Sequence, residues 1–280
     1  MHRSNRASLT TRNGTSSPLA AIKVAAIDLD GVVYQGRTMI DGADTAISRL
    51  RQQGLRIVFA TNSSIRTRTD IALKLRGMGI PAEENEVLTS AFIAGLLVKN
   101  IRASGKVLAI GAEGLRSEIA HAGAMVVAEP PCDLVVVGMD TAFSYEKIRL
   151  AMEAIAGGAV FVACNRDASF PGSNGHMFPG CGPMVAAIEA AVGFPPHHIA
   201  GKPNVRMLQT IAAQYHVRPS EILVVGDVMA SDIEMAVAFG SPSVLVALGA
   251  SKFTPGTPGP TCTVEFLADL PSLLGAVAGF

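Results

Sequence analysis

Short apolar runs alternate with segments of helical periodicity along most of this chain of 280 residues. Strand-like runs lie at 23–28, 56–61, 222–227 and 243–248, and helical spacing recurs at 43–53, 69–78 and 230–239. Because parallel strands need long crossover connections, this alternation predicts a doubly wound parallel sheet in an α/β fold. Aromatic residues make up only 5% of the chain, so we expect a mainly aliphatic core.

The middle of the chain has the features of a second α/β unit. Strand-like runs lie at 107–111, 124–128, 134–138 and 160–164, with helical patterns at 92–101 and 145–155. No polar linker separates this unit from its neighbours, so its limits have to be taken from the motifs that flank it.

Acidic residues stand where the first of these apolar runs ends. Asp28 and Asp30 are two positions apart, and such residues of an extended segment point to the same side. Ligands of open α/β sheets bind beyond the carboxyl ends of strands, where two carboxylates can divide nucleophilic attack and proton transfer. An ordinary polar turn remains the alternative for this pair.

Asp227 ends another run of consecutive apolar residues. A carboxylate in such a place is costly unless it is paired or bound to a metal. Together with Asp28 and Asp30 it would form an oxygen-rich site that suits Mg²⁺, water and a substrate phosphate. Taken alone, Asp227 could equally be the N-cap of the following helix.

Two further polar clusters could contact a phosphate. Residues 61–64, Thr-Asn-Ser-Ser, end the second apolar run and offer hydroxyl and N–H groups near a helix start. Lys202, in the sequence Gly-Lys-Pro-Asn, precedes another helical segment and could neutralise a phosphate. A helix cap and a surface lysine are the alternatives for each cluster alone, but the order acid pair, hydroxyl, lysine, acid indicates one site.

That order resembles the four motifs of the haloacid dehalogenase (HAD) superfamily. The matching positions are Asp28 with Asp30, Thr61, Lys202, and Asp227 with Asp232. Segments 60–64, 162–167, 170–171, 178–182 and 201–203 are also similar to subfamily IIA, the NagD-like group of p-nitrophenyl and phosphoglycolate phosphatases. The chain departs from that pattern at Ser63, at Cys164 and at 228–232, which puts fine specificity in doubt but not the reaction.

The resemblance covers the chain from about residue 23 to the C-terminus and implies its domain organisation. We expect a Rossmann-like doubly wound core at 21–88 and 186–280. An α/β cap domain of the C2 type is expected at 89–185, inserted between the second and third motifs. Composition, not the resemblance, bears on residues 1–20: they are rich in Ser, Thr, Arg and Asn, lack Asp and Glu, and are expected to form a disordered extension.

The resemblance also implies a magnesium-dependent phosphatase, a phosphoric monoester hydrolase that works through an aspartyl phosphate. Asp28 would attack phosphorus, and Asp30 would protonate the leaving oxygen and then activate water. The implied phosphate-binding residues are Thr61, Asn62, Ser63 and Lys202. The implied Mg²⁺ ligands are the Asp28 carboxylate, the Asp30 backbone carbonyl and Asp227, with Asp232 orienting water around the metal.

Specificity is expected to lie in the cap, because the core offers every ester the same phosphate site. The candidate loop runs from 165 to 176, and its candidate residues are Asn165, Asp167, Phe170 and His176. The alternative is a solvated connection in a cap that only excludes water.

The sequence leaves open the exact reaction, the substrate and the oligomeric state. A phosphotransferase or phosphomutase would use the same Asp28, and a non-catalytic HAD-fold binding protein is a further alternative. The substrate is expected to be a small phosphorylated metabolite whose identity stays open, as does the choice between monomer and homodimer.

Composition argues against several classes of partner. Lys plus Arg and Asp plus Glu both number 23, with no basic block, so we expect no nucleic acid partner. No apolar run approaches the ~18 residues of a membrane span, and the first 20 residues lack a secretory pattern. The four cysteines form no CxxC pair, so we expect reduced thiols in a cytoplasmic protein.

Overall fold

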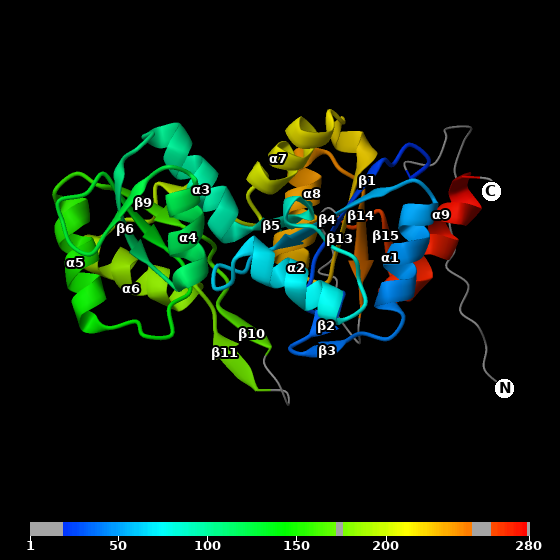
Figure 1. The fold of residues 1–280 in the computed structure, drawn as a ribbon, viewed down its shortest axis with the longest axis horizontal. Coiled ribbons are helices and arrows are strands. Elements are labelled where there is room, and N and C mark those ends of the chain that lie inside the picture. Colours follow the sequence, from blue (N-terminus) through cyan, green and yellow to red (C-terminus); the bar gives the residue numbers. More distant parts are fainter. Residues whose placement is uncertain (1–18, 172–175, 248–258, 279–280) are drawn as a thin grey trace.

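The computed structural model describes residues 19–171, 176–247 and 259–278. The extension expected at 1–20 therefore lies almost wholly outside the described residues, as does the segment 172–175 of the candidate specificity loop. Two lobes lie side by side along the long axis of the molecule, each built around its own sheet (Figure 1).

The first lobe contains a six-stranded sheet with the order β15-β14-β13-β1-β4-β5. Its strands are β1 (Val24–Ile27), β4 (Arg56–Thr61), β5 (Val87–Thr89), β13 (Ile222–Gly226), β14 (Ser243–Val246) and β15 (Cys262–Val264). Every neighbouring pair is parallel. The doubly wound parallel core expected from the alternation of elements is confirmed.

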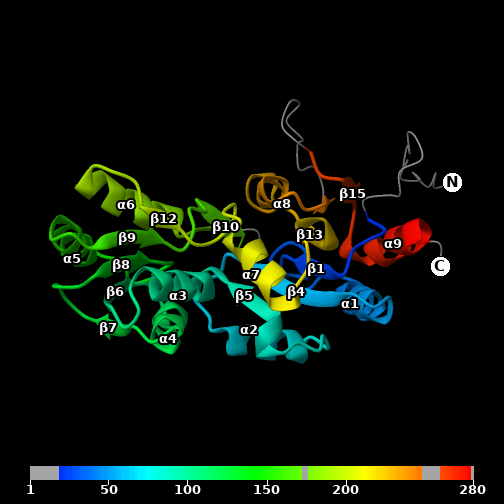
Figure 2. The ribbon, with the colours of Figure 1, turned by 90° about the horizontal axis from the view of Figure 1, so that it is seen from above.

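Helices cover both faces of this sheet (Figure 2). The helices are α1 (Ala43–Gln52), α2 (Arg68–Gly77) and α9 (Leu270–Ala278) on one face, and α7 (Arg206–Tyr215) and α8 (Glu234–Phe239) on the other. The alternation of side chains along β1 divides the core, because Ile27 packs in the cluster that contains Leu50 of α1. Ala26 belongs instead to the cluster that contains Leu208 of α7.

The second lobe contains a five-stranded parallel sheet with the order β12-β9-β8-β6-β7. Its strands are β6 (Lys106–Ile110), β7 (Met125–Val127), β8 (Leu134–Val137), β9 (Val160–Ala163) and β12 (His198–Ile199). Its helices are α3 (Ser90–Ile101) and α4 (Glu113–His121) on one face, and α5 (Tyr145–Ala156) and α6 (Gly182–Val192) on the other. The expected inserted α/β unit is thus present as a separate sheet.

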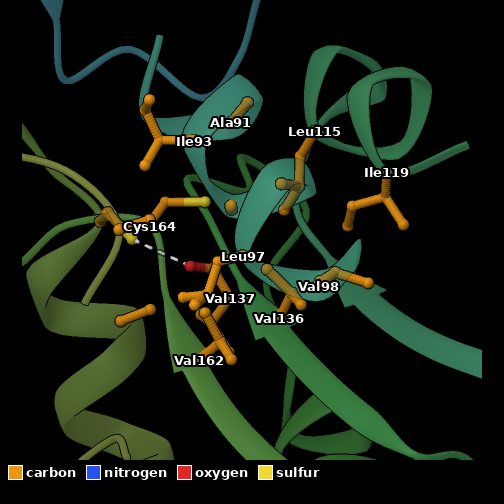
Figure 3. Close-up of a cluster of buried hydrophobic side chains, with 14 of the residues drawn as sticks. Ala91, Ile93, Leu97, Val98, Leu115, Ile119, Val136, Val137, Val162 and Cys164 are labelled. Carbon is orange, nitrogen blue, oxygen red and sulfur yellow. Dashed lines mark hydrogen bonds between the residues drawn. The ribbon is translucent and has the colours of Figure 1, made fainter. Parts of the chain in front are cut away.

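Aliphatic side chains fill the space between α3, α4 and this second sheet (Figure 3). Leu97 and Val98 of α3 and Leu115 of α4 lie over Val136 of β8. The helices approach closely at Gly95, where an added Cβ would lie 2.8 Å from the backbone carbonyl oxygen of Glu118. A side chain there would force α3 and α4 apart.

The second sheet extends beyond the limit expected for the cap. β12 pairs with β9, so residues past 185 still belong to this sheet, and α6 packs beside α5. A boundary at 185/186 would cut through the lobe, and we propose instead that the chain returns to the core near residue 200.

Two short antiparallel hairpins extend from the lobes. One is β2 (Tyr34–Gln35) with β3 (Thr38–Met39), directly after β1. The other is β10 (Ser169–Pro171) with β11 (Met177–Pro179), which projects from the second lobe near the junction of the two (Figure 1). Short 3₁₀ helices also lie at Glu84–Glu86, Pro219–Glu221 and Leu267–Asp269.

One helix begins differently from the expected range of 230–239. A π-helical turn occupies Met229–Ile233, and α8 proper starts at Glu234. The turn places Oδ1 of Asp232 2.6 Å from Nζ of Lys202 and Oδ2 of Asp232 3.3 Å from the N–H of Val228. Such turns are frequent at functional sites, and here the turn directs a carboxylate toward the sheet end.

Across the three described ranges, no helix combines the length and the apolar character that a membrane crossing requires.

Candidate active site

The carboxyl ends of three adjacent strands bring the predicted acids together. β1 lies between β13 and β4, with Ile27 level with Val225 on one side and Phe59 on the other. Asp28 therefore follows the central strand, and its N–H donates to the Val225 carbonyl at 2.8 Å. Asp227 follows β13 and Thr61 ends β4, so all three lie at the same edge.

Lys202 lies at the centre of this edge, and its side chain is only 3% exposed. Its Nζ is 2.5 Å from Oδ1 of Asp28 and 2.6 Å from Oδ1 of Asp232. Burial alone would lower the pKa of Lys202, but the charges of Asp232 and Asp28 outweigh it and raise that pKa. The lysine is thus a fixed cation between two carboxylates, not a surface side chain.

Three carboxylates surround one small volume beside this lysine. Asp28, Asp227 and Asp232 each offer an oxygen, and these oxygens all lie within 4.8 Å of one another. Burial raises the pKa of Asp28 well above its usual value, although the charge of Lys202 opposes the shift. Burial and then the charge of Asp232 raise the pKa of Asp227 to about 6.

This oxygen-only donor set fits a hard divalent cation such as Mg²⁺. One lysine cannot neutralise three ionised carboxylates, so a cation would relieve the repulsion that adds to burial in raising the pKa values of Asp28 and Asp227. Asp30 is not one of the three carboxylates: its side chain is exposed, which is consistent with a backbone-only role at the metal.

Two glycines permit this close packing. Gly31 has φ of +87°, and a Cβ there would collide with Oδ2 of Asp227. A Cβ at Gly226 would collide with the carboxylate of Asp232. Side chains at either position would displace an acid of the site.

The hydroxyl-rich segment after β4 has two different uses. Thr61 is buried, and its Oγ1 accepts a hydrogen bond from the N–H of Ser63 at 3.1 Å. The Asn62 side chain instead holds the lysine segment: Oδ1 accepts from the N–H of Lys202 at 2.8 Å. Its Nδ2 donates to the Lys202 carbonyl at 3.2 Å and to the Asp167 carboxylate at 3.0 Å. Among the predicted phosphate ligands, Asn62 therefore keeps only its backbone as a candidate donor.

The candidate specificity residues separate into two pairs. Asn165 is buried, and its Nδ2 donates to the Asn62 carbonyl at 2.7 Å while its Oδ1 accepts from the N–H of Asp167 at 3.0 Å. Burial raises the pKa of Asp167, which the hydrogen bond from Asn62 opposes. Asn165 and Asp167 thus join the cap loop to the core.

Phe170 and His176 lie farther out, on the β10–β11 hairpin. The Phe170 ring stacks on Phe178 with centroids 5.9 Å apart and 27° between the planes. Phe178 is 48% exposed, and His176 is also exposed. Phe170 and His176 are placed where they can contact a ligand, whereas Asn165 and Asp167 are hydrogen-bonded at the contact with the core.

The motif pattern missed the surroundings of Asp30. Lys74 of α2 donates from Nζ to the Gly36 carbonyl at 2.8 Å, and Nζ lies 3.1 Å from the ring centroid of Tyr34. Protein around Asp30 raises its pKa by desolvation, and the charge of Lys74 opposes that shift. Helical periodicity alone gives no signal for this contact, because its partners lie in a different element.

Comparisons with known proteins agree with this geometry. Residues 25–125 match the family described as haloacid dehalogenase-like hydrolase, and residues 199–270 match the one described as HAD-hydrolase-like. The sugar-phosphatase AraL of Bacillus subtilis is 36% identical over 228 residues, which are 81% of this chain and 83% of the relative. An acid sugar phosphatase of Staphylococcus epidermidis is 32% identical over 227 residues, which are 81% of this chain and 87% of that relative.

Solved structures show the same fold over both lobes. A p-nitrophenyl phosphatase from Archaeoglobus fulgidus superposes with a TM-score of 0.84 at 26% identity, covering 90% of this chain and 99% of that one. A glycerol phosphate phosphatase from Mycobacterium tuberculosis, solved in complex with magnesium, superposes with a TM-score of 0.83 at 33% identity. The match covers 93% of this chain and 80% of that one. The strand-end acids, the buried lysine and these matches agree: the chain belongs to the haloacid dehalogenase-like hydrolases.

Proposed function

We propose that this haloacid dehalogenase-like phosphatase hydrolyses small phosphate monoesters through a phosphoryl group carried on Asp28. The observation that carries the proposal is the buried Lys202 between Asp28 and Asp232, with Asp227 beside them. A fixed cation and a cation-binding acid group at a strand end are what a dianionic substrate needs next to a carboxylate nucleophile.

The proposed first step is in-line attack. An oxygen of Asp28 forms a bond to phosphorus while the bond from phosphorus to the ester oxygen breaks, and Asp30 gives that oxygen its proton. The ion pair with Lys202 holds the Asp28 carboxylate in place. Thr61 Oγ1, the backbone of 62–63 and Lys202 are positioned to bind the phosphoryl oxygens.

The proposed second step restores the enzyme. Asp30, now ionised, takes a proton from a water molecule, which attacks the phosphorus of the aspartyl phosphate. The bond from phosphorus to Asp28 breaks, and inorganic phosphate leaves. The same residue thus serves as acid and then as base.

Mg²⁺ fits the acid group, with Asp28 and Asp227 as the carboxylate ligands and the Asp30 carbonyl as a further oxygen. Asp232 binds Lys202 directly, so we assign it to holding the lysine and water around the metal. When bound, the cation would offset the repulsion between carboxylates and phosphate and polarise the phosphoryl oxygens.

The substrate class we propose is a phosphorylated sugar or polyol. The two relatives above are sugar phosphatases by name, and a solved structure of the same fold is a glycerol phosphate phosphatase. The half-buried Phe170, the exposed Phe178 stacked on it and the exposed His176 would contact the alcohol part of the ester.

Because all four cysteines are free, we place the protein in the cytoplasm.

The nucleophile is tested with Asp28→Asn. We expect kcat for p-nitrophenyl phosphate to fall roughly 10³-fold or more, with Asp41→Asn, at an exposed position after β3, as the matched control. Near-normal turnover by a folded Asp28→Asn protein would exclude covalent catalysis by this residue. No turnover by the unmodified protein on any ester would favour a binding protein.

The metal is tested by chelation. EDTA should abolish activity and Mg²⁺ should restore it, whereas Ca²⁺ should do so poorly because it prefers a looser and larger coordination shell. Full activity in EDTA would reject the metal.

The phosphotransferase alternative predicts a different product ratio. A hydrolase releases inorganic phosphate and nitrophenol in equal amounts even when glycerol is added, because water accepts the phosphoryl group. Phosphate well below nitrophenol in the presence of an added alcohol would identify a transferase.

A further inference from the structure

Lys74 is a half-buried lysine on α2, outside every motif of the active site. Its Nζ donates to the Gly36 carbonyl at 2.8 Å and lies 3.1 Å from the centroid of the Tyr34 ring. Among the described residues it forms no ion pair with a carboxylate. The charge of Lys74 is therefore used to grip the β2–β3 hairpin at its turn and at one side.

That hairpin begins in the turn that contains Asp30. The N–H of Gly31 donates to the Tyr34 carbonyl at 2.9 Å, and the N–H of Tyr34 donates to the Leu29 carbonyl at 3.1 Å. Asp30 and Tyr34 also form an isolated bridge, and the Tyr34 side chain is buried. The backbone of Asp30 is thus enclosed by a loop whose far end is fixed by Lys74.

We propose that Lys74 is a positioning residue, which clamps the β2–β3 hairpin to α2 and thereby holds Asp30 where it can protonate the leaving oxygen. This rests on the role given to Asp30 under the proposed function. Lys74 touches neither Asp28 nor Lys202 in the structure, so loss of the clamp should leave phosphate binding and nucleophilic attack in place.

The dependence of kcat/KM on the leaving group separates a positioning role from a general structural role, because a general loss of structure would lower kcat/KM for all esters alike. Phenyl phosphate and p-nitrophenyl phosphate share a ring, but the oxygen that departs from phenyl phosphate is the stronger base and depends more on a proton from Asp30. The quantity to compare is kcat/KM, because it reports the steps up to loss of the alcohol and excludes the later attack by water.

The experiment measures kcat/KM for both esters in the wild type, Lys74→Met, Lys74→Arg and Asp30→Asn. Since general acid catalysis contributes roughly 10²–10⁴-fold, we expect Lys74→Met to lose about tenfold more activity on phenyl phosphate than on p-nitrophenyl phosphate. Lys74→Arg keeps a cation and a donor for Gly36 and should recover most of the loss. Arg76→Met, at an exposed position of the same helix, is the matched control.

The outcomes separate the two proposals. If Asp30→Asn shows the selective loss but Lys74→Met loses both esters equally or not at all, the positioning role is wrong and the proposed mechanism stands. If Asp30→Asn shows no selective loss, the acid role of Asp30 fails and the clamp fails with it. Should Lys74→Met not fold, Tyr34→Leu removes the ring under the cation and is expected to give the same selective loss.

Discussion

Asn62 connects three parts of the candidate active site through its side-chain amide and its backbone carbonyl. The amide binds both backbone groups of Lys202 and the carboxylate of Asp167. The backbone carbonyl accepts from Nδ2 of Asn165 and from Oγ of Ser90, each at 2.7 Å. The resemblance implies that Asn62 belongs to the phosphate-binding segment 61–64. Its side chain fixes the segment that carries the lysine, which leaves its backbone N–H for that predicted role.

Truncation of this side chain should therefore affect both stability and rate. Asn62→Ala leaves the N–H and carbonyl of Lys202 without their partner, which costs about 1–3 kcal/mol in a buried setting. We expect a lower free energy of unfolding by denaturant and a lower kcat, because Lys202 loses its fixed position. Asn100→Ala, at an exposed position of α3, is the control; equal behaviour of the two variants would contradict the role.

Asp227 makes the stability of the metal-free protein depend on pH. Its pKa is raised from 3.8 to about 6 in the folded state, so the folded protein binds more protons than the unfolded chain between these values. The contribution of Asp227 to the free energy of unfolding is therefore most favourable below about pH 4 and is lost as the pH rises through 6, by up to about 2–3 kcal/mol.

The comparison that isolates this residue is thermal unfolding in EDTA, wild type against Asp227→Asn, from pH 4 to 8. We expect the variant to be the more stable above pH 6 and the difference to shrink toward pH 4. Mg²⁺ should stabilise the wild type increasingly as the pH rises, because its ligand must be ionised to bind. A constant difference between the two proteins over this range would show that Asp227 does not titrate as stated.

At the scale of elements, the loop between β4 and α2 carries the contact between the lobes. Gly114 at the start of α4 donates to the Ile65 carbonyl at 3.0 Å, and Ser64 Oγ accepts from the N–H of Met139 at 2.9 Å. Arg68 of α2 pairs with the buried Glu118 of α4 at 3.0 Å. The loop that begins with the proposed phosphate-binding segment therefore also contacts and supports the cap.

A methyl group added at Gly114 should disturb both the contact between the lobes and the segment proposed to bind phosphate. A Cβ at Gly114 would collide with the backbone of Ile65 and Arg66, so Gly114→Ala has to shift a loop or a helix, at about 1–3 kcal/mol. We expect lower stability and a raised KM. Gly77→Ala, where a Cβ meets nothing within 4 Å, is the control and should be neutral or stabilising. A Gly114→Ala protein as stable as the control would show that the lobes are more loosely joined.

The β10–β11 hairpin is the element proposed to read the substrate. If it does, Phe170→Ala or His176→Ala should change kcat/KM unequally across a panel of sugar, polyol and aryl phosphates, by roughly 10–200-fold for a lost contact. Met152→Ala, at an exposed position of α5 in the same lobe, should change none of them. A uniform loss over the panel would move the search to other parts of the cap.

At the scale of the whole molecule, the sequence by itself determined the alternating elements and the order of the acids. Periodicity depends on near neighbours along the chain and sets the strands and helices. Because the carboxyl ends of parallel strands share one edge of a sheet, residues that follow or end such strands, as Asp28, Thr61 and Asp227 do, could be expected at that edge. The fold class and the family were predictable for this reason.

Only the tertiary structure decided which groups meet. Lys202 reaches Asp28 across 174 residues of chain, Asn62 turns to that lysine, and β12 joins the second sheet past its expected limit. The same holds for Lys74, whose partners Tyr34 and Gly36 belong to another element. Local sequence sets the direction in which a side chain leaves its own strand or helix. The partner that it meets depends on how distant elements pack together, and that packing is determined by burial of apolar side chains from the whole chain.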